Sequence, residues 1–125
     1  PRIRLVPVPD HALLVVRGGL IGPSTIRSDA ARFRRRYPGW GRYGISAFLA
    51  ADDQEVQVLC ETRLERFRAV TVYERAALRN VDIEVVPTFR RPHVTLARTD
   101  VDALVSGLES CEHRELTNPY TGGWR

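Results

Sequence analysis

A histidine and a threonine lie one residue apart in RRPHVTLARTD, residues 90–100. If this segment is a β-strand, His93 and Thr95 point to the same face, roughly 6.5 Å apart. A phosphate would fit between an imidazole that titrates near neutral pH and a hydroxyl that donates a hydrogen bond. Arg90 and Arg91, in the turn before the strand, could hold the same anion. The alternative is an ordinary edge-strand histidine with a structural hydrogen bond.

The residues RPHVTLAR resemble one of the two His-x-Thr motifs of the 2H phosphoesterases, the RNA-ligase-like cyclic phosphodiesterases. The resemblance implies that His93 and Thr95 contact a phosphate. A second motif is missing, because neither His11 nor His113 has a Thr or Ser at that offset. A looser hypothesis is a toxin-type ribonuclease that needs no cofactor. In it, His93 acts with His113 or His11 and with arginines to cleave RNA through its 2′-hydroxyl.

A second set of residues lies on three other predicted strands: Arg17 in VVRGG, Ser46 in YGISAF and Glu84 in VDIEVVP. The set is similar to the Arg-Ser-Glu pattern of ADP-ribosyltransferases. That resemblance implies that Arg17 and Ser46 hold nicotinamide adenine dinucleotide (NAD) and that Glu84 orients the attacking group. Two details differ from the family, since ISAF lacks its Ser-Thr-Ser run and Asp82 stands where Glu or Gln is usual. The alternative is that all three residues have no role beyond their strands.

Arginines are interleaved with aromatic residues in ARFRRRYPGWGRYG, residues 31–44. Single-stranded nucleic acids are bound by this combination, because the charges follow the backbone and the rings stack on bases. Phe33 and Tyr37 fall on the apolar stripe of a predicted helix, so we expect them to be buried. The candidate nucleic-acid contacts are Arg34, Arg35, Arg36, Trp40, Arg42, Tyr43, Arg90 and Arg91. The alternatives are a solvated helix face and a non-catalytic module that binds RNA or protein.

The chain has 19 basic residues, all of them arginine, against 15 acidic residues, and its net charge is +4. The absence of lysine excludes lysine-based chemistry. The surplus of guanidinium groups favours RNA as a partner, or an acidic protein such as a cognate antitoxin. No apolar run approaches the ~18 residues of a membrane span, and prolines interrupt the first ten residues. We therefore expect a cytoplasmic protein with no membrane partner.

The length of 125 residues predicts a single domain, residues 1–125. Strands are predicted within residues 11–19, 42–50, 68–74, 81–89 and 93–97. Helices are predicted over 24–37, within 52–67 and from Asp100 onward, with one further helical turn at 75–80. This order indicates an α+β fold in which about three helices pack on one mixed sheet of about five strands. Cys60 and Cys111 fall on helical apolar stripes and are expected to be buried, and no metal site is predicted.

Overall fold

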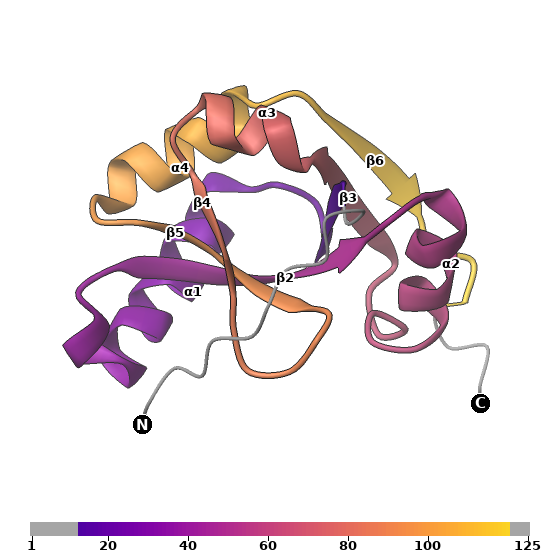
Figure 1. The fold of residues 1–125 in the computed structure, drawn as a ribbon, viewed down its shortest axis with the longest axis horizontal. Helices are drawn as coiled ribbons and strands as arrows, with labels where there is room; N and C mark the ends of the chain where they lie inside the picture. The colour runs from indigo at the N-terminus through magenta and orange to yellow at the C-terminus, as the bar shows by residue number, and fades with distance from the viewer. Residues whose placement is uncertain (1–12, 121–125) are drawn as a thin grey trace.

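In the part of the chain that the computed structural model describes, residues 13–120, six strands form one antiparallel sheet (Figure 1). The strands are β1 (Leu14–Gly18), β2 (Tyr43–Ala50), β3 (Ala69–Glu74), β4 (Glu84–Pro87), β5 (His93–Arg98) and β6 (His113–Thr117). Their order in the sheet is β4-β5-β2-β1-β3-β6. The predicted α+β class and single sheet are confirmed, but all the pairings between these strands are antiparallel, so the sheet is not mixed as predicted. Strands β4 and β5 form a hairpin.

Strand β6 is not predicted by the sequence pattern. It reads HRELT, which lacks the apolar alternation of a half-buried strand, and most of its residues are exposed. It pairs with β3 at the edge of the sheet, where Leu116 lies opposite Val70. Because edge strands often carry charged side chains, β6 is defined by its pairing partner more than by its own sequence.

Four α-helices and one short 3-10 helix occur within residues 13–120. They are α1 (Pro23–Arg36), η1 (Pro38–Trp40), α2 (Asp53–Glu61), α3 (Arg75–Asn80) and α4 (Val101–Ser110). The Asp100 carboxylate caps α4 by accepting a hydrogen bond from the Asp102 backbone N–H at 2.8 Å, which confirms the predicted start. Helix α1 matches the prediction over 24–37 to within one residue at each end. None of the described helices has the length and apolarity needed to cross a membrane.

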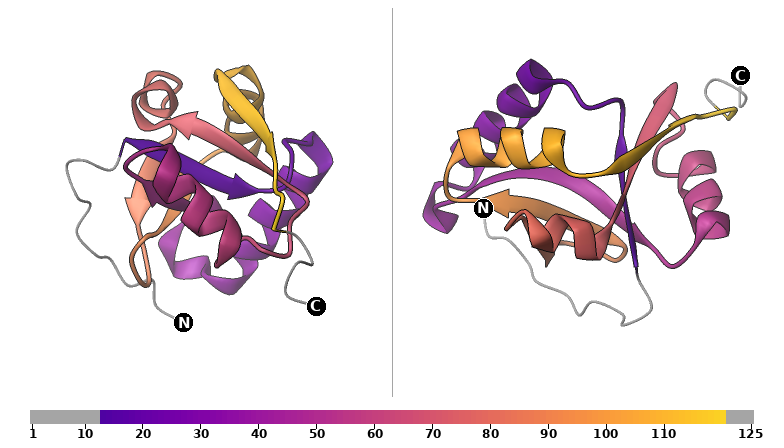
Figure 2. Two further views of the ribbon diagram at one scale, coloured as in Figure 1. Left: turned by 90° about the vertical axis from the view of Figure 1, so that its right-hand side faces the viewer. Right: turned by 90° about the horizontal axis from the view of Figure 1, so that it is seen from above.

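Three helices, α1, α3 and α4, cover one face of the sheet. Helices α1 and α4 lie side by side on it (Figure 2). Val94 and Leu96 point into this layer and are fully buried. The Tyr73 side chain is also fully buried, and its hydroxyl donates a hydrogen bond to the Leu108 carbonyl oxygen at 2.9 Å. This layer forms the larger part of the hydrophobic core.

The second face of the sheet is covered only in part. Helix α2 packs there against Val16 and Val72, and it lies at the opposite end of the molecule from α1 (Figures 1 and 2). Further along the same face, Ser46 of β2 is exposed and His93 of β5 is half-buried. The register supports this placement, because Phe48 lies opposite both Val16 and His93. One helix is too short to cover the whole face, so the β2 and β5 part stays open to a ligand.

Both cysteines are free and buried, as predicted. Cys60 lies on the buried side of α2, and Cys111 follows the last residue of α4 and packs in the larger core layer. Burial raises the pKa of each thiol above its ordinary value. Both groups therefore stay protonated at neutral pH and act as small apolar side chains.

Candidate functional site

A groove of about 640 Å³ lies over the open part of the second sheet face. Its volume is in the range of small-molecule sites, roughly 300–1,000 Å³. The charged residues that line it are Arg17, Arg32, Arg36, Arg63, Arg66 and Asp29. The rings that line it are those of Phe33, Tyr37, Phe48, Phe67, Phe89 and His93. With five arginines against one carboxylate, and with flat rings between them, the groove is suited to an anion that also carries aromatic groups.

Two glycines allow aromatic rings to lie directly on the strands of this groove. A Cβ atom on Gly18 would lie 2.4 Å from the ring of Phe67, and one on Gly44 would lie 3.0 Å from the ring of Phe33. Real Cβ atoms essentially never come within 3.0 Å of another atom, so a side chain at Gly18 would displace the Phe67 ring. At Gly44 the Cβ atom would also lie 2.5 Å from Thr95 Cγ2, so a side chain there would displace Thr95 and press on the Phe33 ring. The glycines therefore set the shape of the groove.

His93 is held in the groove by its Nδ1 atom. Nδ1 lies 3.2 Å from the Thr88 carbonyl oxygen and 3.0 Å from the Thr88 hydroxyl. A carbonyl oxygen can only accept, so in the tautomer that donates to it the proton lies on Nδ1 and the lone pair of the neutral ring lies on Nε2. No hydrogen bond joins Nε2 to any residue of 13–120. The imidazole is thus oriented as a proton acceptor.

Burial lowers the pKa of His93 below its ordinary value of 6.5. The positive charge of Arg63 lowers the pKa further, and the hydrogen bond with the Thr88 backbone opposes both effects. His93 is therefore neutral at neutral pH. A neutral, oriented imidazole is the form that a general base requires.

Thr95 does not share the site with His93, and the prediction that it donates to a phosphate is wrong. Both residues lie on the predicted common face, but Thr95 is fully buried. Its hydroxyl lies 2.8 Å from the hydroxyl of Thr88, which is also fully buried. The β4–β5 loop covers Thr95 and leaves His93 accessible, so only half of the His-x-Thr motif faces the groove.

Phe89, in the same loop, has a left-handed backbone conformation with φ of 64°. For a bulky residue this region costs roughly 1–3 kcal/mol, so the surroundings must hold it. Its ring lies 5.7 Å from the Tyr37 ring and 5.2 Å from the His93 ring, measured between centroids. Backbone strain of this kind is concentrated at ligand sites, and here it places an aromatic wall beside His93.

Arg17, on β1, also lines the groove and is 6% exposed. Its Nη2 atom donates to the Asp29 carboxylate at 2.7 Å, and its Nη1 atom donates to the Gly18 carbonyl oxygen at 3.1 Å. Its Nε atom is buried without a hydrogen-bond partner among the described residues. Buried donors are almost always paired, so this guanidinium has unused capacity for an anion.

The structure brings Arg17 and Ser46 into one groove but leaves Glu84 outside it. Ser46 is exposed on β2, and its hydroxyl forms no hydrogen bond with residues 13–120. Glu84, at the start of β4, accepts a hydrogen bond from Arg42 at 2.7 Å and does not line the groove. The expected position of Glu84 beside Arg17 and Ser46 is therefore wrong. The groove instead contains Asp29, which is paired with Arg17, and His93.

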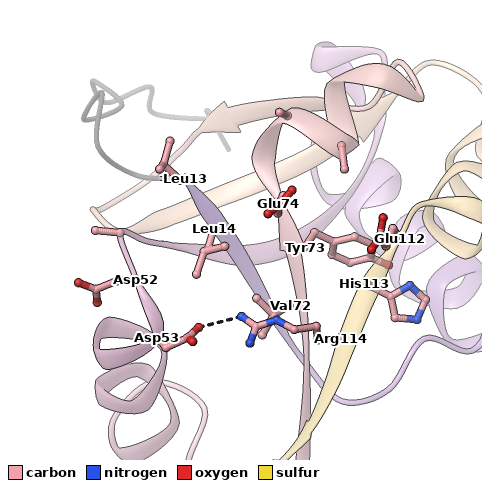
Figure 3. Close-up of a pocket in the computed structure, with 13 residues that line it drawn as sticks. Leu13, Leu14, Asp52, Asp53, Val72, Tyr73, Glu74, Glu112, His113 and Arg114 are labelled. Atoms are coloured by element: carbon pink, nitrogen blue, oxygen red, sulfur yellow. Dashed lines mark hydrogen bonds and ion pairs between the residues drawn. The ribbon is translucent and has the colours of Figure 1, made fainter.

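His113 lies in a separate cavity of about 650 Å³ between β1, β3, β6 and the start of α2 (Figure 3). Its Nδ1 atom donates to the Cys111 carbonyl oxygen at 2.8 Å. Four carboxylates line this cavity, and one of them, that of Asp53, pairs with Arg114 at 2.8 Å. His113 therefore does not act with His93 as predicted. His11 lies outside the described residues.

The predicted nucleic-acid contacts divide between the groove and its surroundings. Arg36 lines the groove. Outside it, Arg34 lies over the Tyr43 ring and Arg42 over the Trp40 ring, each 5.1 Å from the ring centroid. Three further candidates, Arg35, Arg90 and Arg91, are exposed and do not line the groove. Arg90 and Arg91 thus do not clamp an anion beside His93.

Phe33 and Tyr37 are half-buried groove residues, and the prediction that they join the core is wrong. Helix α1 buries only Ile26 and Ala30 fully. The last turns of α1, before η1 and β2, line the groove, so the apolar stripe continues into the groove wall.

Several groove residues were missed in the sequence. Phe48 could have been found, because it lies two residues after Ser46 and so shares its strand face. Arg63, Arg66 and Phe67 follow α2 in an irregular segment with no motif. Their position in the groove depends on how that segment returns to β3.

Comparison of the chain with protein-family models, with curated proteins and with solved structures finds no match. Among residues 13–120, no group of three or more His, Cys, Asp or Glu side chains could hold a metal ion.

Proposed function

We propose that the groove binds NAD and that the protein is an enzyme of the ADP-ribosyltransferase type. The observation that carries the proposal is the position of Arg17 and Ser46. They are the two residues that the family resemblance assigns to NAD, and they line one groove together with an oriented, neutral His93. This function ranks above RNA cleavage because two of its three predicted residues, Arg17 and Ser46, line the groove. Of the residues predicted for cleavage, Thr95 and His113 do not line it and His93 does.

The lining of the groove supports a dinucleotide. Guanidinium groups pair with pyrophosphate oxygens, and Arg17 has an unused buried donor for this purpose. Rings such as those of Phe48 and Phe67 can stack on the flat nicotinamide and adenine groups. The volume of about 640 Å³ is sufficient for such a ligand.

In the proposed reaction, the bond between the nicotinamide nitrogen and ribose carbon C1′ breaks, and nicotinamide leaves with the electron pair. An oxygen or nitrogen of the acceptor bonds to C1′ and transfers its proton to Nε2 of His93. Water in place of the acceptor gives free ADP-ribose and the same release of nicotinamide. His93 here takes the role that the resemblance assigns to Glu84. Asp29 cannot readily take this role, because its carboxylate is paired with Arg17.

Two measurements with unlabelled NAD test the proposal. NAD should raise the midpoint of thermal unfolding, because a ligand that binds only the folded state stabilises it by about 2.7 kcal/mol at 100 times its Kd. Nicotinamide, measured by chromatography, should accumulate with time. An unchanged unfolding midpoint together with no nicotinamide release at millimolar NAD would reject the proposal.

Replacing Glu84 with glutamine should leave nicotinamide release unchanged. Glu84 lies outside the groove, and its ion pair with Arg42 is solvent-exposed, so the free energy of unfolding should fall by at most about 1 kcal/mol. Glu84→Gln and the unmodified chain are compared in the nicotinamide assay and in thermal unfolding. Loss of nicotinamide release in a folded variant would restore Glu84 as the catalytic carboxylate.

A second candidate function is RNA cleavage of the toxin type, which the position of His93 among arginines favours. His93 could take the proton of a 2′-hydroxyl while a guanidinium such as that of Arg63 stabilises the charge on the phosphate. This activity would produce 2′,3′-cyclic phosphate ends from RNA without NAD. An acidic protein such as an antitoxin would inhibit either activity by covering the arginines of the groove.

A further inference from the structure

A chain of aromatic rings runs from outside the groove to His93. The Trp40 ring, on η1, lies 5.5 Å from the Phe33 ring, and the Phe33 ring lies 5.0 Å from the Tyr37 ring. The chain continues through Phe89 to His93, with centroid distances of 5.7 and 5.2 Å. Trp40 is the member of this ring track that does not line the groove. The track therefore joins the outer surface of the protein to the proposed catalytic histidine.

Guanidinium groups accompany the ring track. The Arg42 guanidinium lies 5.1 Å from the Trp40 ring centroid, and that of Arg36 lies 5.8 Å from the Tyr37 ring centroid. Beside them, Arg34 lies over the Tyr43 ring. A guanidinium over a ring is held by cation–π attraction, and its outward N–H groups remain able to bind phosphate. The track thus combines stacking surfaces with positive charge along one path.

We propose that the acceptor of ADP-ribose is a single-stranded nucleic acid that lies along this ring track. The inference rests on the proposed function, since it names the acceptor for the same site. An unpaired strand offers both a flat base and a phosphate at every residue, which is the pattern that alternating rings and guanidinium groups recognise. In a duplex the bases are stacked on each other, so the rings could not reach them.

The strand would present its nucleophile at the inner end of the track, next to His93. A hydroxyl oxygen or base nitrogen of the strand forms the bond to C1′ of the ribose while the bond to nicotinamide breaks. The proton of the nucleophile moves to Nε2 of His93, and nicotinamide is the second product. No oxidant or further reactant is needed.

The test uses NAD labelled in its adenylate phosphate and oligonucleotides of about twelve nucleotides, a length suited to single-strand sites. RNA, single-stranded DNA and duplex DNA form three arms, and nicotinamide is measured in each. We expect label on one or both single strands and none on the duplex. Trp40→Ala should lower the ratio of labelled strand to released nicotinamide about tenfold, from the loss of one stacking surface. Trp40→Phe, which keeps a ring, should restore most of it.

Arg42 and Arg27 provide a matched pair of variants. Both are partly exposed arginines with a single carboxylate partner, and neither lines the groove. They differ in that Arg42 lies over the Trp40 ring of the track, whereas Arg27 pairs with Asp102 near the start of α1 and lies over no ring of residues 13–120. Arg42→Gln should weaken strand binding, measured by fluorescence anisotropy, and make it less dependent on salt, whereas Arg27→Gln should not. Equal effects of the two variants on strand binding would overturn the proposal that the strand lies along the ring track.

The outcomes separate this inference from the proposed function. Nicotinamide release with no label on either single strand, or with label on an added protein mixture instead, would overturn the nucleic-acid acceptor and leave the NAD enzyme intact. Absence of nicotinamide release in every arm would overturn both. Equal labelling of the duplex would also overturn the stacking argument.

Discussion

Replacing His93 with alanine is expected to slow nicotinamide release about 100- to 10,000-fold, the usual contribution of a general base. Nε2 is the atom that accepts the proton, and the Thr88 carbonyl oxygen fixes its direction through Nδ1. Alanine removes both nitrogen atoms and also the ring contacts with Phe48 and Phe89, at 5.4 and 5.2 Å. Release is measured at saturating NAD, so that a change in NAD affinity does not contribute to the result.

Two variants separate catalysis from packing. His93→Phe keeps a ring between Phe48 and Phe89 but has no proton acceptor, so it should be as slow as His93→Ala. His113→Ala removes a histidine from the other cavity and should leave release unchanged. Full activity in folded His93→Phe would show that His93 only supports the groove.

The pH dependence gives an independent check of the same role. Burial lowers the pKa of His93, so the neutral form persists below pH 6.5. The rate should therefore stay constant as the pH falls through 6.5 and decline only around the lowered pKa. The unfolded chain takes up its proton near pH 6.5, before the folded chain does, so the free energy of unfolding should also fall below that pH. If the rate declines on the acid side with a midpoint above pH 6.5, the role of His93 as the general base is contradicted.

Replacing Arg17 with methionine is expected to weaken NAD binding about 10- to 100-fold with little loss of stability. A hydrogen bond to a charged group is worth about 1.5–3 kcal/mol, and tenfold in affinity corresponds to about 1.4 kcal/mol. Arg17 is 6% exposed and has an unpaired Nε, which is unfavourable for folding. An apolar side chain of similar length removes that unpaired donor. Its former partner, Asp29, is 35% exposed and can be hydrated.

The measurements are NAD titration and denaturant unfolding, with Arg98→Met as the control. Arg98 is half-buried, donates to the Val81 carbonyl oxygen and does not line the groove. That variant should bind NAD as the unmodified chain does. Buried ion pairs are often replaced by apolar side chains without loss of stability, so both parts of the Arg17 prediction are compatible. If Arg17→Met lowers the free energy of unfolding by several kcal/mol and leaves the affinity for NAD unchanged, Arg17 is a structural residue and the prediction is wrong.

The fold could be predicted from local patterns to a large extent. Apolar alternation and periodicity located β1 to β5 and the helices, because burial of one face leaves a regular trace in the sequence. Asp100 marked the start of α4, since a capping carboxylate acts on the N–H groups of its own first turn. Strand β6 was missed, because its mostly exposed residues carry no such trace and only its pairing with β3 identifies it.

The candidate site could be predicted only in part. His93, Arg17 and Ser46 were identified by residue type and strand position, and all three line the groove. Thr95, Glu84 and His113 satisfied similar local criteria and lie elsewhere. Whether such a residue lines the groove depends on side-chain contacts with other segments. One example is the hydrogen bond between the hydroxyls of Thr88 and Thr95, which are both buried.

The sequence by itself determined the elements and the surplus of arginine, because periodicity and charge are properties of neighbouring residues. The tertiary structure decided which side chains meet. Three helices cover one sheet face and α2 covers half of the other, so a single stretch of β2 and β5 remains accessible. Within that stretch, the loop that carries Thr88 and Phe89 buries Thr95 and orients His93. These contacts join segments far apart in the chain, and no local pattern records them.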